Sequence, residues 1–311
     1  MKTRAIIAVT IIAFIAPAAF AQQRGQIRFT EVPEGTKIYR DVNYVSNGHQ
    51  RQKLDLYLPR SETKLPLIIW VHGGAWLEGS KENPVPLSYL SEGYAVASIN
   101  YRLSRHALFP SQIEDCKSAV RWLRANANRY NIDPNRFGVW GESAGGHLAA
   151  LLGTTGDVND FDKGENLGVS SRVQAVVDCF GPTDFLQMDM HRLPNGQVHN
   201  SSDSPESKLV GGPIQENKKK AAKANPITYV TKDDAPFLII HGDRDPLVPH
   251  HQSELLEAAL KKADVPVKFY TVEGAGHGGF KDPKVTELTK EFLAKHLKEK
   301  QPEEKAKPLD I

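Results

Sequence analysis

Ser143 lies between glycines at a predicted junction between a strand and a helix. The segment from Phe137 to Leu152 reads FGVWGESAGGHLAALL, in which an apolar run ends at Trp140 and an Ala/Leu-rich run typical of a helix follows the glycines. Glycines on both sides of a serine permit a sharp turn that other side chains would block, and the serine hydroxyl then points outward. The pattern indicates a nucleophile, and the alternative is a glycine-rich turn without chemical function.

A serine hydroxyl is a weak nucleophile unless a base accepts its proton, and the chain has 11 histidines. His277 is the best placed of them, in the loop EGAGHGGF that follows a predicted strand. Because this loop leaves the carboxyl edge of the sheet, where Ser143 also lies, we expect the imidazole to reach the serine. His147 is expected to pack or cap within the helix after Ser143, and His72 to hold a glycine loop through hydrogen bonds.

A carboxylate is also needed, to orient the imidazole and to balance its developing charge. The loop HGDRDPLVP follows another predicted strand and contains both Asp243 and Asp245. We assign Asp245 to this role because it lies within the loop and precedes Pro246. Asp243 directly follows Gly242, so we expect it to hydrogen-bond the turn.

A tetrahedral intermediate of acyl transfer carries an oxyanion, which backbone N–H groups can stabilise. The segment VHGGAW, residues 71–76, ends a predicted strand in glycines and supplies such groups. The predicted donors are Gly74, Ala75 and Ala144, with Gly73 as an alternative. Serine, histidine, aspartate and these donors together predict acyl transfer through a covalent intermediate.

The elements that must position these residues alternate between strand and helix patterns. Strand patterns cover residues 53–59, 65–74, 94–102, 136–140, 173–181, 235–243 and 267–274, and helix patterns cover residues 110–130, 143–153, 252–263 and 284–297. This alternation predicts an α/β fold with a mainly parallel sheet and helices on both faces.

The helix predicted over residues 110–130 has a clear apolar face. Ser111 is its expected N-cap, with Glu114 three residues later. The stripe expected to face the core consists of Ile113, Cys116, Ala119, Val120 and Leu123.

The ends of the chain differ in composition from the region between them. Residues 1–21 combine a basic start, a short apolar run and an Ala-x-Ala site, which predicts a signal peptide and export to the periplasm or the exterior. An uncleaved membrane anchor is the alternative. Residues 22–297 are predicted to form one domain, with a polar, cap-like insertion at 182–230 over the carboxyl edge of the sheet. The charged tail, residues 298–311, is predicted to be disordered.

The composition is that of an ordinary globular protein, and it argues against several partners. Of the 311 residues 40% are hydrophobic and 24% charged, and the formal net charge is +2, so we expect neither nucleic acid nor a stable membrane association. No metal or other cofactor is predicted, because no CxxC or HExxH motif occurs. Cys116 and Cys179 read as small buried residues, although a disulfide between them stays open.

The motifs HGGAW, GESAGGH, HGDRDPLVP and GAGHGG together resemble the α/β-hydrolase superfamily. The similarity extends from about Lys53 to Leu297 and is greatest to secreted carboxylesterases related to hormone-sensitive lipase and to bacterial feruloyl and acetyl-xylan esterases. The resemblance implies a triad of Ser143, Asp245 and His277 and oxyanion donors at the positions named above. One departure is Ala75, which stands where the lipase pattern H-G-G-G has its third glycine. Trp76 and Tyr101 are candidates for lining the substrate cleft, and each is equally compatible with the core.

The sequence and the resemblance together predict a serine carboxylesterase. Its substrates would be small-molecule or carbohydrate esters with short-chain or aromatic acyl groups, and acetyl and feruloyl esters of plant polysaccharide are the leading expectation. The alternatives are a lipase or polyester hydrolase, a serine peptidase and a catalytically inactive binding module. The polar, lysine-rich insertion argues against a lipid-binding lid.

Overall fold

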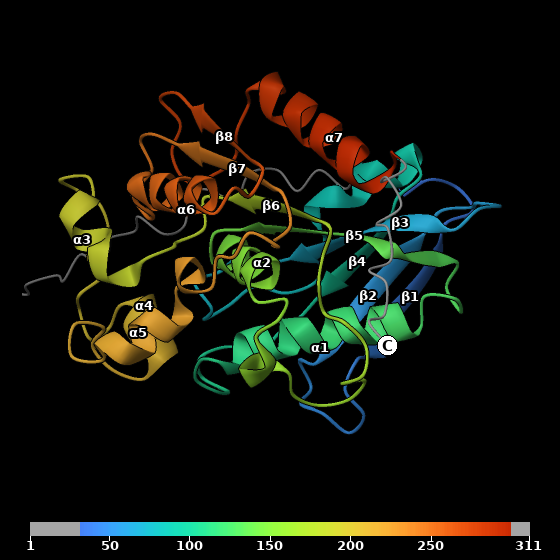
Figure 1. Cartoon of the computed structure of the whole chain (residues 1–311), viewed down its shortest axis with the longest axis horizontal. Coiled ribbons are helices and arrows are strands. Elements are labelled where there is room, and N and C mark those ends of the chain that lie inside the picture. Colours follow the sequence, from blue (N-terminus) through green and yellow to red (C-terminus); the bar gives the residue numbers. More distant parts are fainter. Residues whose placement is uncertain (1–31, 300–311) are drawn as a thin grey trace, which may run out of the picture. The chain divides into compact units, whose positions relative to one another are not determined.

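The computed structural model of the protein describes residues 32–299 (Figure 1). The predicted signal peptide and residues 300–311 of the predicted tail lie outside this range. Among the described residues, no helix combines the length and the apolar character needed to cross a bilayer.

The core of the fold is one eight-stranded sheet with the order β1-β2-β4-β3-β5-β6-β7-β8. Only the pairs β1–β2 and β2–β4 are antiparallel, and every other neighbouring pair is parallel. The strands are β1 (Lys37–Asn43), β2 (Lys53–Leu58), β3 (Leu65–Val71), β4 (Ala95–Ile99), β5 (Ile132–Glu142), β6 (Ala175–Cys179), β7 (Phe237–Gly242) and β8 (Val267–Val272). The predicted mainly parallel sheet is therefore confirmed.

Strand β1 has no counterpart in the sequence prediction. It is an edge strand whose residues are almost all exposed, and its pairing with β2 is irregular between Tyr39 and Val42. Asp41, within that irregularity, has a φ of 53°. The strand is held by pairing along one edge, so it lacks the alternating apolar pattern by which strands are found in a sequence.

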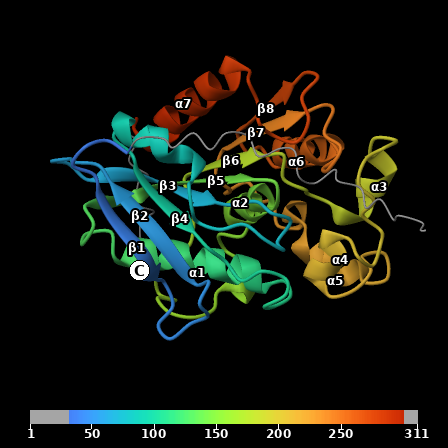
Figure 2. The same ribbon diagram turned by 180° about the vertical axis from the view of Figure 1, so that it is seen from behind.

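Helices cover both faces of the sheet, as predicted. Helices α1 (Ser111–Ala125), α2 (Ala144–Thr154) and α6 (His251–Lys262) contribute to one hydrophobic core. Helix α7 (Pro283–Leu297) and the 3₁₀ helix η2 (Val85–Glu92) pack on the other face. Figures 1 and 2 show α7 and α1 on opposite sides of the sheet.

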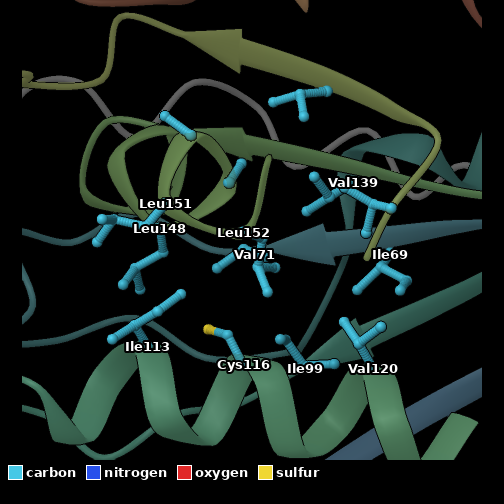
Figure 3. Packing of buried hydrophobic residues seen from close by; sticks show 14 of the residues in the cluster. Ile69, Val71, Ile99, Ile113, Cys116, Val120, Val139, Leu148, Leu151 and Leu152 are labelled. Atoms are coloured by element: carbon cyan, nitrogen blue, oxygen red, sulfur yellow. The ribbon is translucent and has the colours of Figure 1, made fainter. Parts of the chain in front are cut away.

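The first of these cores forms where α1 and α2 meet β3, β4 and β5. In Figure 3 the side chains of α1 point toward the strands, with Cys116 near the middle of the group. The whole stripe predicted for this helix is buried. The labelled side chains are Ile69, Val71, Ile99, Ile113, Cys116, Val120, Val139, Leu148, Leu151 and Leu152.

The predicted N-cap of α1 is wrong. Ser111 is the first helical residue, and the cap position belongs to Pro110, which makes no side-chain capping hydrogen bond. The reason is visible in the backbone, because the Pro110 carbonyl already accepts the first helical hydrogen bond, from the Glu114 N–H at 3.1 Å.

The two cysteines are buried free thiols. Cys116 belongs to the core beneath α1 and α2, whereas Cys179 belongs to the core beneath α7. The sheet therefore separates them, and the disulfide that the sequence left open is not formed.

The insertion at 182–230 contains short helices. They are α3 (Met188–His191), α4 (Pro205–Val210) and α5 (Lys218–Ala224). Two 3₁₀ turns, η4 (Phe185–Gln187) and η5 (Pro226–Thr228), connect these helices to the sheet domain. Figure 1 shows α4 and α5 side by side. Helices of four to seven residues carry too little periodicity to be read from sequence.

Candidate active site

Ser143 occupies a strained turn between the last residue of β5 and the first residue of α2. Its φ of 55° and ψ of −122° lie outside the regions that side-chain-bearing residues favour. A Cβ on Gly141 would lie 2.0 Å from the Gly145 carbonyl oxygen, and one on Gly145 would lie 2.1 Å from that of Val71. Both glycines are therefore required for the close approach of backbone that creates the turn.

Hydrogen bonds at its two backbone groups fix the position of Ser143. Its N–H donates to the Cys179 carbonyl on the neighbouring strand at 2.9 Å, and its carbonyl accepts from the His147 N–H in α2 at 3.0 Å. The serine thus stands at the N-terminus of α2, where the helix dipole favours negative charge. His147 is itself buried, packs edge-on against Trp76, and has its Nε2 2.7 Å from the Ala224 carbonyl.

His277 and Asp245 are hydrogen-bonded to each other across two neighbouring loops. The distance from His277 Nδ1 to Asp245 Oδ2 is 2.6 Å. The loops follow β8 and β7, which are adjacent parallel strands and therefore end at the same edge of the sheet. Asp243 also links the two loops, because its Oδ1 accepts from the Gly274 N–H at 2.6 Å.

Asp245 is held as an ionised carboxylate. Burial alone would raise its pKa, but hydrogen bonds from His241 and His277 outweigh that effect and keep the pKa well below its usual range. Its Oδ1 also accepts from the Leu247 and Val248 N–H groups at 2.8 and 2.9 Å. Every lone-pair direction of the buried group is thereby used to fix its orientation.

His241 and Phe180 contact the pair of Asp245 and His277. Neither residue was identified in the sequence analysis. His241 Nε2 lies 3.1 Å from Asp245 Oδ2, and its Nδ1 lies 2.7 Å from the Ser253 hydroxyl. Phe180 packs edge-on against His277, with ring centroids 4.6 Å apart. The only sequence signal for His241 was its place at the end of a strand in HGDRDPLVP, and for Phe180 there was none.

The glycine loop after β3 packs directly against the serine turn. A Cβ on Gly73 would lie 2.8 Å from the Glu142 carbonyl and 3.3 Å from the Ser143 Cβ. Gly74 and Ala75 follow with φ values of 103° and 54°. Within residues 32–299, the N–H groups of Gly74 and Ala75 have no acceptor.

A buried, neutral histidine holds this loop from behind. His72 Nδ1 lies 2.7 Å from the Gly73 carbonyl, and its Nε2 lies 3.0 Å from the Arg51 guanidinium. Burial lowers the pKa of His72 to about 4, so the ring is uncharged at neutral pH. The uncharged ring of His72 therefore supports the glycine loop through these two contacts.

Tyr101 belongs to this support and is not among the described residues that line the cavity of Ser143. It is fully buried, its ring stacks on His72 at 4.4 Å, and its hydroxyl donates to the His72 carbonyl at 3.0 Å. Trp76 differs, because it lines the same cavity as Ser143. Of the two aromatic candidates, Trp76 and Tyr101, only Trp76 lines the cavity of Ser143.

Ser143 and His277 line one small cavity, of about 60 Å³. The sheet domain contributes Ala75, Trp76 and Ala144 to its walls, so two of the three predicted oxyanion donors, Ala75 and Ala144, border the same space. The insertion contributes Pro182, Gln197, Pro205 and Glu206. The structure thus brings the serine, the imidazole and the cap-like segment together around one space.

Glu142 adds a titratable group beside the imidazole. Burial raises its pKa to about 7, and the charge of His277 opposes that rise. No group of three or more His, Cys, Asp or Glu in the described chain has an arrangement that could hold a metal ion.

Two family models match this chain. A model described as BD-FAE matches residues 54–260, and one for the dienelactone hydrolase family matches residues 220–301. Esterase LipC of Mycobacterium tuberculosis is 34% identical over 217 residues, which are 68% of this chain and 53% of that protein. Arylesterase of Saccharolobus solfataricus is 26% identical over 249 residues, 78% of each chain. This chain covers 43–62% of the mycobacterial relatives it matches.

Solved structures extend the likeness over most of the chain. A truncated carbohydrate esterase from gut microbiota is 36% identical with a TM-score of 0.75, covering 82% of this chain and 95% of its own. An acetyl ester-xyloside bifunctional hydrolase from Caldicellulosiruptor lactoaceticus is 29% identical with a TM-score of 0.63, covering 78% and 84%. The chain belongs to the BD-FAE family and has the α/β-hydrolase fold.

Proposed function

We propose that this protein is a serine carboxylesterase that works through an acyl-enzyme. The observation that carries the proposal is the hydrogen bond of 2.6 Å between His277 and Asp245 in loops that border the cavity of Ser143. Esterases among the relatives and solved structures support the same class of reaction.

In the proposed mechanism, Ser143 Oγ attacks the ester carbonyl while His277 accepts its proton. Because His277 Nδ1 is bonded to Asp245, Nε2 is the nitrogen that takes this proton and later gives it to the leaving alcohol. Asp245 stays ionised and stabilises the imidazolium. The free N–H groups of Gly74, Ala75 and Ala144 bind the oxyanion, and water then releases the acid by the same route.

The proposed acyl group is short, with acetyl as the leading candidate. The cavity of about 60 Å³ is much smaller than the pockets that enclose drug-sized ligands, which are typically ~300 Å³ or more. A feruloyl group would require the insertion to move. The carbohydrate esterase and the acetyl ester-xyloside hydrolase among the similar structures make acetylated carbohydrate the proposed substrate class.

The test compares p-nitrophenyl esters from acetate to dodecanoate with the wild-type protein and with Ser143→Ala. We expect activity to be highest for acetate or butyrate, and the substitution to lower kcat by about 10³-fold or more because the nucleophile is absent. A Ser143→Ala protein with wild-type activity would overturn the assignment.

Two measurements separate the rival functions. Labelling of the wild type, and not of Ser143→Ala, by a fluorophosphonate would reject an inactive binding module. Activity that rises only above the solubility limit of a long-chain ester would favour a lipase over an esterase of soluble esters.

We also propose that the protein is exported, on the basis of the signal-peptide pattern of residues 1–21. N-terminal sequencing of the protein from a cell fraction outside the cytoplasm should give a chain that starts near Gln22. A full-length chain retained in the cytoplasm would contradict export.

A further inference from the structure

We propose that Glu206 selects esters that carry a hydroxyl group close to the ester bond, by accepting a hydrogen bond from that hydroxyl. This inference rests on the proposed esterase function. It concerns a residue of the insertion that no sequence motif indicated, and it assigns a role to the carboxylate that shares the cavity with the nucleophile.

Glu206 is a buried acid with unused hydrogen-bonding capacity. Its side chain is 4% exposed, and the residue lines the cavity together with Ser143 and His277. Oε2 has no hydrogen-bond partner in the described part of the chain. The nearest charged or titratable neighbour is His199, whose Nδ1 lies 3.1 Å from Oε1 without the geometry of a hydrogen bond.

A carboxylate in this position is costly to the folded protein unless it receives donors. Burying a polar group without a hydrogen bond destabilises a folded protein, and burying a charged group does so more strongly. Because Glu206 lines the cavity, a donor bound there lies beside this residue. A substrate hydroxyl is a donor of the right kind, whereas an acidic substrate would be repelled.

Hydrogen bonds among neighbouring residues hold the backbone around Glu206, which lies in the first turn of α4. The Ser204 hydroxyl accepts from the Ser207 N–H at 3.1 Å and donates to the Ser207 hydroxyl, which in turn donates to the Ser201 carbonyl at 2.8 Å. Asp189 accepts from the His199 N–H at 2.7 Å. A site that is already ordered loses less conformational entropy when a ligand binds. A selective contact at such a site therefore contributes more to binding.

The size of the cavity limits where the hydroxyl can be. Ser143 and Glu206 line the same space of about 60 Å³, so we expect the hydroxyl to lie within a few atoms of the ester carbonyl. Two kinds of ester meet this condition: a monoester of a vicinal diol, as in a partly acetylated sugar, and an ester of a 2-hydroxy acid. The phenolic hydroxyl of a feruloyl group lies too far from its carbonyl.

A purely structural role for Glu206 is the competing explanation. An acidic residue in the first turn of a helix interacts favourably with the helix dipole. That role predicts a change in thermal stability when Glu206 is replaced. It does not predict a change in the preference between two substrates that differ by one hydroxyl.

The test measures kcat/KM for two matched pairs of esters. One pair is trans-2-hydroxycyclohexyl acetate and cyclohexyl acetate, and the other is ethyl lactate and ethyl propionate. The proteins are the wild type, Glu206→Gln and the control Glu216→Gln, which changes an exposed glutamate of the same insertion.

We expect the wild type to prefer the hydroxyl-bearing member of at least one pair by about tenfold to a hundredfold, as for a hydrogen bond to a charged group. Glu206→Gln should reduce that preference to threefold or less, and Glu216→Gln should retain it. The pair that responds identifies the alcohol or the acyl side as the one that bears the hydroxyl.

Equal rates for both members of both pairs in the wild type would overturn the inference, even if Glu206→Gln failed to fold. An unchanged preference in a folded Glu206→Gln would overturn it as well. A wild type that hydrolyses none of the four esters and is not labelled by a fluorophosphonate would instead refute the proposed esterase function.

Discussion

At the scale of single residues, the site depends on backbone positions that only glycine can fill. Gly141 and Gly145 flank the serine, and each stands where a Cβ would overlap a backbone carbonyl. Gly73 brings the neighbouring loop against the same turn. The conformation of the turn at Ser143 therefore depends on the absence of side chains at these three positions.

Replacing Gly145 by alanine should disrupt the turn. The new Cβ would lie 2.1 Å from the Val71 carbonyl oxygen, so β3 and the start of α2 must separate. We expect a loss of roughly 1–3 kcal/mol in the free energy of unfolding and a large drop in fluorophosphonate labelling. Thermal unfolding and labelling rates provide the measurement.

Gly168→Ala is the matched control, because a Cβ at that position meets no atom within 4 Å. It should change neither the melting temperature by more than a degree or so nor the labelling rate. A Gly145→Ala protein that behaves like this control would show that the close approach of the two backbones is not required.

At the scale of elements, β6 carries a buried acid at its junction with α2. Asp178 is 1% exposed, and its Oδ1 accepts from the Gly181 N–H at 3.0 Å, while Oδ2 has no partner in residues 32–299. Burial raises the pKa of Asp178 to about 7, and the Gly181 hydrogen bond opposes the rise. The strand thus holds a protonated carboxyl under conditions in which an exposed aspartate is ionised.

This acid should make the stability of the fold depend on pH. The pKa of Asp178 is about 7 in the folded protein, whereas an ordinary aspartate has a pKa of 3.8. The folded state therefore binds the proton more tightly than the unfolded chain does. The contribution to the free energy of unfolding is therefore full below about pH 4 and is lost as the pH rises to about 7. The difference between a pKa of 3.8 and one of about 7 corresponds to roughly 4 kcal/mol in the free energy of unfolding.

Asp178→Asn should remove this dependence, because asparagine resembles the protonated acid. We expect the variant to match the wild type at pH 4 and to exceed its free energy of unfolding at pH 8 by up to ~4 kcal/mol. Urea unfolding at both pH values measures the difference. Asp233→Asn, at an exposed position, should leave the curve unchanged, and an Asp178→Asn curve parallel to the wild type would refute the argument.

At the scale of the whole molecule, one sheet brings the loops of the candidate site to the same edge. It also separates the two hydrophobic cores. The loops after β3, β5, β7 and β8 leave the same edge because these strands run parallel within one sheet. The same sheet keeps the apolar side chains of α1 and α2 apart from those of α7. Cys116 and Cys179 lie on opposite sides of this division.

A reductant should therefore leave the stability of the protein unchanged. Burial raises the pKa of both thiols well above its usual range, which also makes them unreactive in the folded state. We expect equal melting temperatures with and without dithiothreitol, and reaction of both thiols with a thiol reagent only after unfolding. A lower melting temperature in dithiothreitol would indicate a disulfide.

Features with strong local patterns could be predicted from the sequence. The buried strands and the stripe of α1 follow from hydrophobic periodicity, and the serine turn follows from its glycines. Strand β1 and helix α4 could not be predicted in this way, because an exposed edge strand and a six-residue helix carry little periodicity. The N-cap of α1 was misplaced by one residue, which is within the usual uncertainty of helix ends.

The sequence alone determined the fold class and which side chains stand at the ends of the strands, because periodicity and glycine placement are local properties of the chain. Only the tertiary structure decided that His241 and Phe180 contact the pair Asp245 and His277, and that Glu206 lines the same cavity as Ser143. These contacts join residues far apart in the chain, and their geometry depends on how neighbouring loops pack. A linear pattern of residue types contains no information about that packing.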